Sequence, residues 1–124
     1  MLFRSVTNIF EIMSRADCIG LFSTVEGLPN AICEGMMLKK PVLMSKVSDY
    51  EFFESSGGVI LCDPMDVDSI KSALISLIDT PWNELKSMGE KNYQFASHHF
   101  SNDVITDAWL DKIYEIEDAK KTRK

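Results

Sequence analysis

The sequence predicts an α/β fold in which a parallel sheet is flanked by helices. Short apolar runs rich in β-favouring residues alternate along the chain with longer segments whose apolar residues recur every three or four positions. The short runs are apolar throughout, which is typical of strands buried on both faces of a parallel sheet. With 45% apolar and 26% charged residues among 124, the chain has the composition and the length of one folded domain.

The first part of the chain is predicted to hold two helices and two strands. Asn8 and Glu11 have the spacing of a capping box, and the apolar stripe that follows continues to about Ala16, so a helix is predicted there. Pro29 favours the start of a second helix, which is predicted to end near Leu38. The strands are predicted at the apolar runs 18–22 and 41–45.

The second part is predicted to hold one more strand and four helices. A short helix is expected at 50–54 and the strand at 59–62. Either Asp66 or Asp68 starts the next helix. Thr80 is expected to cap the following one, with Pro81 at its first helical position, and Ser101 is expected to cap the last.

Three strands make a small sheet for an α/β domain. The first recognisable element is a helix, and residues 2–6 have the character of the end of an earlier strand. We therefore expect a doubly wound domain whose opening strands are missing. Residues 1–117 would form this partial domain, and residues 118–124 a basic C-terminal tail.

The charge balance excludes nucleic acid as the main partner. Nineteen Asp and Glu against thirteen Lys and Arg give a net charge of −6, whereas proteins that bind phosphate backbones carry a basic surplus. Four basic residues do gather at the C-terminus, which leaves open a solvated tail or a contact with the inner face of a membrane. They are Lys120, Lys121, Arg123 and Lys124.

The cysteine pattern predicts a cytoplasmic protein. Cys18, Cys33 and Cys62 are isolated, odd in number and surrounded by apolar residues, which argues against zinc or a disulfide framework and favours a reducing compartment. No apolar run reaches membrane-spanning length, and the N-terminal segment is too interrupted by polar residues for a signal peptide.

The segment most informative about function follows the first predicted strand, at the edge where open α/β sheets bind ligands. Its predicted helix has Leu28 at the cap position, which offers no side-chain acceptor, so the N–H groups near Asn30 and Ala31 would stay free. A helix start of this kind suits a phosphate. Gly27 lets the backbone approach a ligand, and Glu26 lies in the same loop.

Glu34 lies one helical turn further along and has no basic residue at helical spacing to pair with it. A carboxylate on a mostly apolar stripe needs hydrogen-bond donors, and sugar hydroxyls would provide them. The residues leave two interpretations open. Either this segment binds a phosphate and a sugar, or the helix start is simply hydrated and Glu26 and Glu34 are ordinary surface carboxylates.

The same segment resembles the donor-site signature of the family 4 glycosyltransferases, the group 1 enzymes of the GT-B fold. The resemblance rests on S-x-x-E-G-L-P-N-x-x-x-E-G-M at residues 23–36, preceded by A-D-C-I-G-L-F and followed by K-K-P-V. It extends over about 6–114 and includes V-I-L-C-D-P-M-D at 59–66. It implies that the chain forms one part of the C-terminal, Rossmann-like donor-binding domain of such an enzyme.

The family transfers a sugar from a nucleotide-diphosphate sugar to an acceptor hydroxyl, usually with retention, and no metal or other cofactor is expected. By resemblance, Glu26 is the candidate catalytic residue and accepts hydrogen bonds from the donor sugar. Glu34 binds the ribose hydroxyls. The backbone between them holds the diphosphate and sugar hydroxyls, and two residues border the pocket with less support from the motif. The backbone residues are Gly27, Leu28, Pro29, Asn30 and Ala31, and the bordering residues are Ser23 and Thr24.

Several parts of the family's machinery have no counterpart in this sequence. The Arg and Lys that clamp the diphosphate, a Gly-rich loop and the acceptor-binding domain would all lie upstream. His98 and His99 fall between the last two predicted helices and cannot replace the family's histidine. We therefore expect a donor-binding half-domain that is inactive alone, so whether the isolated chain is an enzyme stays uncertain.

The resemblance also implies partners. The family's C-terminal helix crosses back onto the N-terminal domain, and an apolar stripe on the last predicted helix would do so here, at Ile105, Trp109, Ile113 and Ile116. The alternatives are a non-catalytic interaction subunit, docked on an upstream-half polypeptide or self-associated through the sheet edge and the last helix, and a small nucleotide-binding module.

Overall fold

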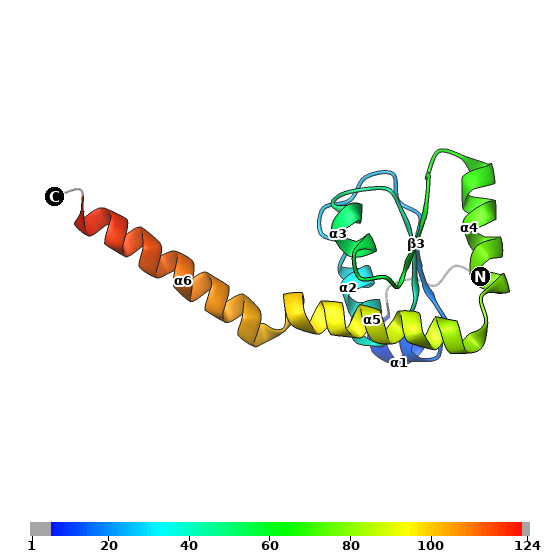
Figure 1. Cartoon of the computed structure of the whole chain (residues 1–124), viewed down its shortest axis with the longest axis horizontal. Helices are drawn as coiled ribbons and strands as arrows, with labels where there is room; N and C mark the ends of the chain where they lie inside the picture. The colour runs from blue at the N-terminus through cyan, green and yellow to red at the C-terminus, as the bar shows by residue number, and fades with distance from the viewer. Residues whose placement is uncertain (1–5, 123–124) are drawn as a thin grey trace.

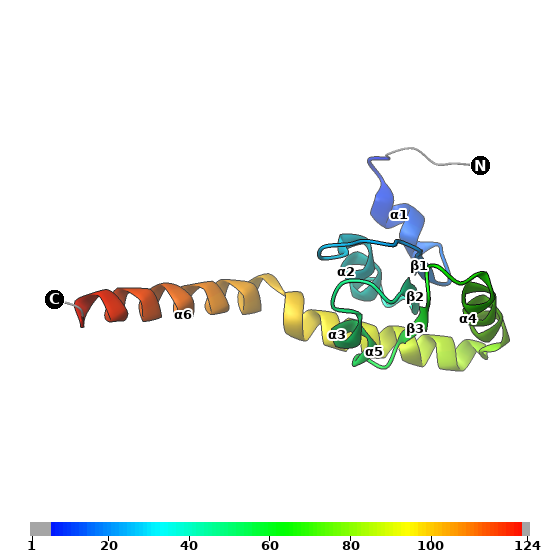
Figure 2. The ribbon, with the colours of Figure 1, turned by 90° about the horizontal axis from the view of Figure 1, so that it is seen from above.

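The computed structural model describes residues 6–122 and shows three parallel strands surrounded by helices (Figures 1 and 2). The sheet order is β1-β2-β3, so each strand pairs with the next one along the chain. In chain order the elements are α1 (Ile9–Ser14), β1 (Ile19–Leu21), α2 (Asn30–Met37), β2 (Val42–Ser45), α3 (Tyr50–Glu54), β3 (Val59–Cys62), α4 (Val67–Asp79), α5 (Trp82–Phe100) and α6 (Asn102–Lys121). The predicted α/β class with a parallel sheet is confirmed. The possible earlier strand at 2–6 lies, apart from Val6, outside the described residues.

Two of the predicted caps are correct. The Asp66 side chain accepts from the N–H of Asp68 and so caps the start of α4, and the Ser101 hydroxyl accepts from the N–H of Val104 at the start of α6. Such caps depend on neighbours in sequence, so a sequence can predict them. The choice left open between Asp66 and Asp68 is decided in favour of Asp66.

Two other predicted caps are wrong. The hydroxyl of Thr80 donates to the carbonyl of Ser76 at 2.7 Å and so belongs to the end of α4, and Pro81 takes the cap position of α5. At α1, Asn8 donates to Glu11 at 3.4 Å but accepts no helix N–H, so the capping box is not formed.

α5 runs below the strands in the view of Figure 1 and lies against the loop 38–41 that precedes β2. Its Gly89 lies so close that a Cβ there would overlap the carbonyl group of Lys39. One turn later the buried Asn92 donates from Nδ2 to the carbonyls of Lys40 and Gly58, both at 2.9 Å. Asn92 therefore joins the helix to the ends of two strands.

Replacing Gly89 with alanine is expected to destabilise the protein by about 1–3 kcal/mol. Within a helix the same change normally stabilises by about 0.5–1 kcal/mol, because alanine has the higher helix propensity. A decrease in the free energy of unfolding would therefore report the close approach of α5 to Lys39. Urea unfolding measures this change. A stabilised Gly89→Ala variant would show that α5 does not lie against this loop.

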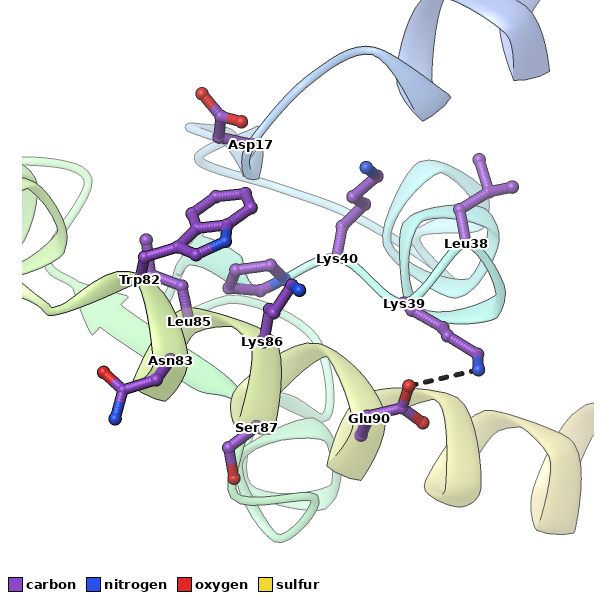
Figure 3. Close-up of a pocket in the computed structure, with 11 residues that line it drawn as sticks. Asp17, Leu38, Lys39, Lys40, Trp82, Asn83, Leu85, Lys86, Ser87 and Glu90 are labelled. Carbon is purple, nitrogen blue, oxygen red and sulfur yellow. Dashed lines mark hydrogen bonds and ion pairs between the residues drawn. The ribbon is translucent and has the colours of Figure 1, made fainter.

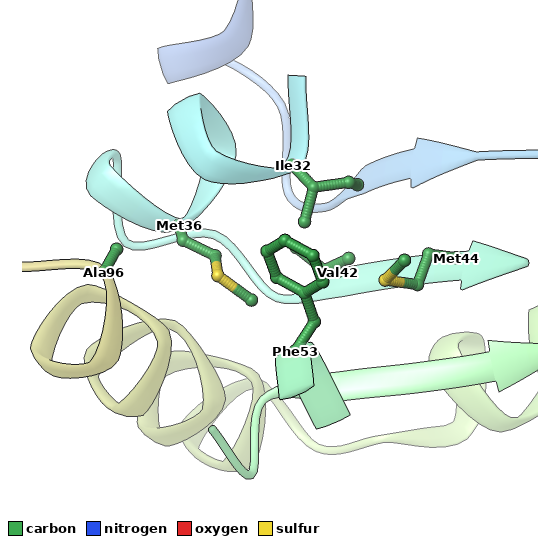
Figure 4. Close-up of a cluster of buried hydrophobic side chains, with 6 residues drawn as sticks. All are labelled: Ile32, Met36, Val42, Met44, Phe53 and Ala96. Atoms are coloured by element: carbon green, nitrogen blue, oxygen red, sulfur yellow. The ribbon is translucent and has the colours of Figure 1, made fainter. Parts of the chain in front are cut away.

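The main core fills the face of the sheet that α2, α3 and α5 cover (Figure 4). Val42 and Met44 of β2 point to this face, and Leu43 between them points to the opposite face, where it packs with Cys62 and Ala73 of α4. All residues of β2 are buried, as the unbroken apolar run predicts for a central parallel strand. The main cluster consists of Ile32, Met36, Val42, Met44, Phe53 and Ala96.

The structure leaves two surfaces without a partner among the described residues. β1 pairs only with β2, and because the Ile19 N–H points to β2, the backbone groups of Gly20 point to the open edge. α6 extends away from the rest of the chain in both views and has no buried residue (Figures 1 and 2). Its apolar stripe is exposed, with Trp109 at 67%. Of the helices in the described part, none is long and apolar enough to cross a membrane.

Candidate functional site

The candidate site lies at the C-terminal ends of β1 and β2, where the loop 22–29 connects β1 to α2 (Figure 1). Parallel pairing in the register Ile19 to Val42 brings these two strand ends together. The loops that follow the strands therefore share one edge of the sheet, which is where open α/β sheets bind ligands.

Within the loop, Ser23 and Glu26 are joined by a hydrogen bond. The Ser23 hydroxyl donates to Glu26 Oε1 at 2.7 Å, and both side chains are half-buried. No Lys, Arg or His among the described residues forms an ion pair with Glu26. One carboxylate oxygen is thus held by the loop itself, and the other remains available to accept hydrogen bonds from a ligand.

The start of α2 has no side-chain cap. Its cap residue is Pro29, and not Leu28 as predicted. The backbone of Pro29 has φ −78° and ψ 88°, which lies outside the helical region, so the helix begins only at Asn30. The Pro29 carbonyl accepts from the third and fourth N–H groups that follow it, at 3.0 and 3.2 Å. Within the described part, the N–H groups of Asn30 and Ala31 have no acceptor, as the sequence predicts. The positive end of the helix is therefore open to a ligand.

The loop in front of this helix faces open space. A Cβ built on Gly27 would meet no atom within 4 Å, and the side chain of Leu28 is 61% exposed. Packing within the chain therefore does not require glycine at position 27. The space beside the backbone of Gly27 is available to a ligand.

A second loop, at 46–49 after β2, holds the first one in place. The Ser48 hydroxyl donates to the carbonyl of Gly27 at 2.6 Å, and Ser48 adopts a left-handed backbone with φ +54°. The buried Ser45 donates to the carbonyl of Leu21 at 3.3 Å. No local sequence pattern predicts a role for either serine, because these contacts join residues that are 21 and 24 positions apart in sequence.

Glu34 lies one turn into α2 and is half-buried. Its neighbour Gly35 is buried so closely against Ile19 of β1 that a Cβ there would lie 2.8 Å from the isoleucine side chain. This packing fixes the helix on the sheet. Glu34 has no ion-pair partner among the described residues, and it forms no hydrogen bond to the loop that holds Glu26.

Other chemistries find little support in the described residues. No group of three or more His, Cys, Asp or Glu side chains there is placed to hold a metal ion. Burial raises the pKa of the Cys18 thiol to about 11, which makes it a weak nucleophile. His98 is exposed, and His99 packs against the rings of Phe52 and Phe95. Both histidines lie in the last turn of α5, and not between the last two helices as predicted.

Taken together, the geometry suits a ligand that has both an anionic group and hydroxyl groups. Two free N–H groups at a positive helix end would bind the anion, and the carboxylates of Glu26 and Glu34 would accept hydrogen bonds from hydroxyls. Comparison with protein families matches residues 1–95 to the family described as glycosyl transferases group 1. No curated protein matches the chain.

Proposed function

Because the chain belongs to the group 1 glycosyltransferases, we propose that it binds a nucleoside-diphosphate sugar at the loop 22–29 and the start of α2. The observation that carries this proposal is the uncapped helix start beside a carboxylate that its own loop holds in place. The N–H groups of Asn30 and Ala31 bind the diphosphate, and Glu26 accepts from hydroxyls of the sugar. Glu34 accepts from the two ribose hydroxyls.

These contacts fit a transfer of the sugar to an acceptor hydroxyl. When the bond between the anomeric carbon and the diphosphate oxygen breaks, negative charge grows on the diphosphate, and the open helix end stabilises it. The acceptor oxygen then bonds to the anomeric carbon, and its proton passes to the departing diphosphate oxygen. We place this reaction in a hexosyltransferase of polysaccharide or glycolipid synthesis in the cytoplasm, a compartment that the isolated cysteines favour.

We further propose that the described residues are the second half of a GT-B donor domain, which is inactive alone. No Lys or Arg occurs between Phe22 and Met37, so the segment supplies no side-chain cation for the diphosphate. The open edge of β1 and the exposed stripe of α6 would contact the rest of the enzyme, either an upstream-half polypeptide or a second copy.

Replacing Glu26 with alanine tests the proposed sugar contact. In the wild-type chain a nucleoside-diphosphate sugar is expected to bind about ten-fold more tightly than the nucleoside diphosphate alone, because the charged Glu26 accepts from its sugar hydroxyls. In Glu26→Ala the two ligands should bind alike. Titration with UDP, GDP and ADP and with their hexose conjugates, followed by ligand-observed NMR, measures the difference, and Glu51→Ala is the control.

The same preparations test the expected inactivity. Neither the wild-type chain nor Glu26→Ala should transfer sugar to an acceptor. Transfer by the purified wild-type chain that Glu26→Ala abolishes would contradict the half-domain proposal. Equal affinities for both ligands in the wild-type chain would contradict the role of Glu26.

A non-catalytic interaction subunit is the second candidate function, and the exposed stripe of α6 favours it. In that case the chain would co-purify in a complex of defined mass, and nucleoside diphosphates would not bind to it. Native mass measurement together with the titration separates the two candidates, because the first requires binding at the loop 22–29.

A further inference from the structure

A groove of about 500 Å³ lies at the opposite end of the sheet from the loop 22–29 (Figure 3). One wall is the first two turns of α5, and the other is the loop 38–41 between α2 and β2. Gly89 and Asn92 fix α5 to this loop, and the groove opens on the N-terminal side of that attachment. Asp17, just before β1, closes the third side.

The lining of the groove is partly apolar and includes an exposed aromatic ring. Pro41 is buried, Leu85 is half-buried, and Trp82, in the exposed first turn of α5, is 57% exposed. An exposed tryptophan in a concave site offers a flat apolar surface together with an N–H donor. Such a surface suits the flat face of a ring-shaped ligand.

Cations outnumber carboxylates around this ring. Lys39, Lys40 and Lys86 line the groove with Asp17 and Glu90, which leaves a surplus of one positive charge in a chain whose net charge is −6. Glu90 is already paired with Lys39 at 3.1 Å. The charges left for a ligand are therefore those of Lys40 and Lys86, with Asp17 on the rim.

The ammonium groups of Lys40 and Lys86 still have hydrogen-bond donors available for a ligand. Lys40 Nζ donates to the carbonyl of Ser14 at 2.8 Å, and Lys86 Nζ lies 5.9 Å from the centre of the Trp82 ring. Neither forms an ion pair within the described residues, and each ammonium carries three donors. In Figure 3 the indole of Trp82 and the side chain of Lys40 flank the opening of the groove.

We infer that this groove is a second ligand site, which binds an acidic saccharide. The Trp82 ring would stack on the face of one sugar ring, Lys40 and Lys86 would bind its carboxylate, and Asp17 would accept from its hydroxyls. The choice of a saccharide rests on the family, whose members handle sugars, and not on the proposed donor site. Because the groove is at the other end of the strands, it anchors a saccharide and does not take part in the transfer.

Tryptophan fluorescence tests the site. The chain holds two tryptophans, so Trp109→Phe provides a background in which only Trp82 reports. Adding a tetramer of galacturonic acid should change the emission of Trp82 in a saturable way. Lys40→Gln and Lys86→Gln should each weaken binding about three-fold, and the double variant about ten-fold, as expected for exposed charge pairs. Lys112→Gln, on α6, is the matched control and should leave binding unchanged.

Four results would overturn the inference. Maltotetraose, the neutral probe, could bind as tightly as the acidic tetramer, or the double variant could keep the wild-type affinity. Inorganic phosphate could bind as tightly as the tetramer, which would make the groove a simple anion site. Absence of any emission change up to millimolar tetramer would also overturn it. Glu34→Ala should leave this binding intact, so a failure of the donor-site proposal is distinguishable.

Discussion

Replacing Asn92 with leucine is expected to lower the free energy of unfolding by about 3 kcal/mol or more. Leucine has a similar size, so the core stays filled, but the carbonyls of Lys40 and Gly58 and the hydroxyl of Ser56 lose their partner. Each buried polar group left unsatisfied costs about 1–3 kcal/mol. Urea unfolding at neutral pH, followed by circular dichroism, measures the effect.

The control for this prediction is Asn83→Leu, which changes an exposed asparagine of the same helix. It should alter stability by no more than about 0.5 kcal/mol. If Asn92→Leu were as mild as the control, the hydrogen bonds that join α5 to the ends of β2 and β3 would not contribute to stability as the structure implies.

Replacing Glu34 with alanine is expected to abolish discrimination between ribose and its deoxygenated analogue. The wild-type chain should bind a nucleoside diphosphate about ten-fold more tightly than its 2′,3′-dideoxy form, because two hydroxyls donate to one carboxylate. In Glu34→Ala both ligands should bind with the weaker affinity. Calorimetric or NMR titration of each of the two proteins with each of the two ligands measures how far the preference for ribose depends on Glu34.

A matched control for this cycle is Glu84→Ala, an exposed carboxylate in the first turn of α5. That variant should retain the full ten-fold preference for ribose. A preference that survives in Glu34→Ala would place the ribose elsewhere and would leave Glu34 as an ordinary helix residue, which is the alternative that the sequence left open.

The sequence predicted those parts of the fold that depend on neighbouring residues. α3 and β3 have the predicted bounds, because an aromatic cluster and an unbroken apolar run define them locally. β1 is shorter than the predicted run 18–22, since only Ile19–Leu21 finds partners on β2. Phe22 leaves the sheet and remains 49% exposed.

Tertiary contacts limited what the sequence could predict. Thr80 and Pro81 have the pattern of a cap and a first helical residue, but the hydroxyl of Thr80 finds an acceptor in the preceding helix. Asn92 lies inside a helical pattern, where a polar residue is expected on the surface. In the structure it is hydrogen-bonded to the carbonyls that precede two strands. The glycine at position 89 is likewise required by a tertiary contact, the close approach of the Lys39 carbonyl, and not by the local sequence.

The candidate site shows the same division. The open start of α2 follows from local sequence, since Pro29 and its neighbours offer no acceptor. That Ser23 would hold Glu26, and that Ser48 would hold the Gly27 carbonyl, requires the loops to be placed by the sheet. The motif thus indicated the candidate residues, and the structure added how two of them, Glu26 and Gly27, are held in place.

Backbone amide NMR shifts show most simply whether the open end of α2 binds the diphosphate. α4 provides an internal control, since its start follows β3 at the same edge of the sheet but is capped by Asp66. On addition of UDP, GDP or ADP, we expect the largest shifts at Asn30 and Ala31, and none at Asp68. Equal shifts at both helix starts, or no shift at Asn30 and Ala31 at millimolar nucleotide, would contradict this expectation.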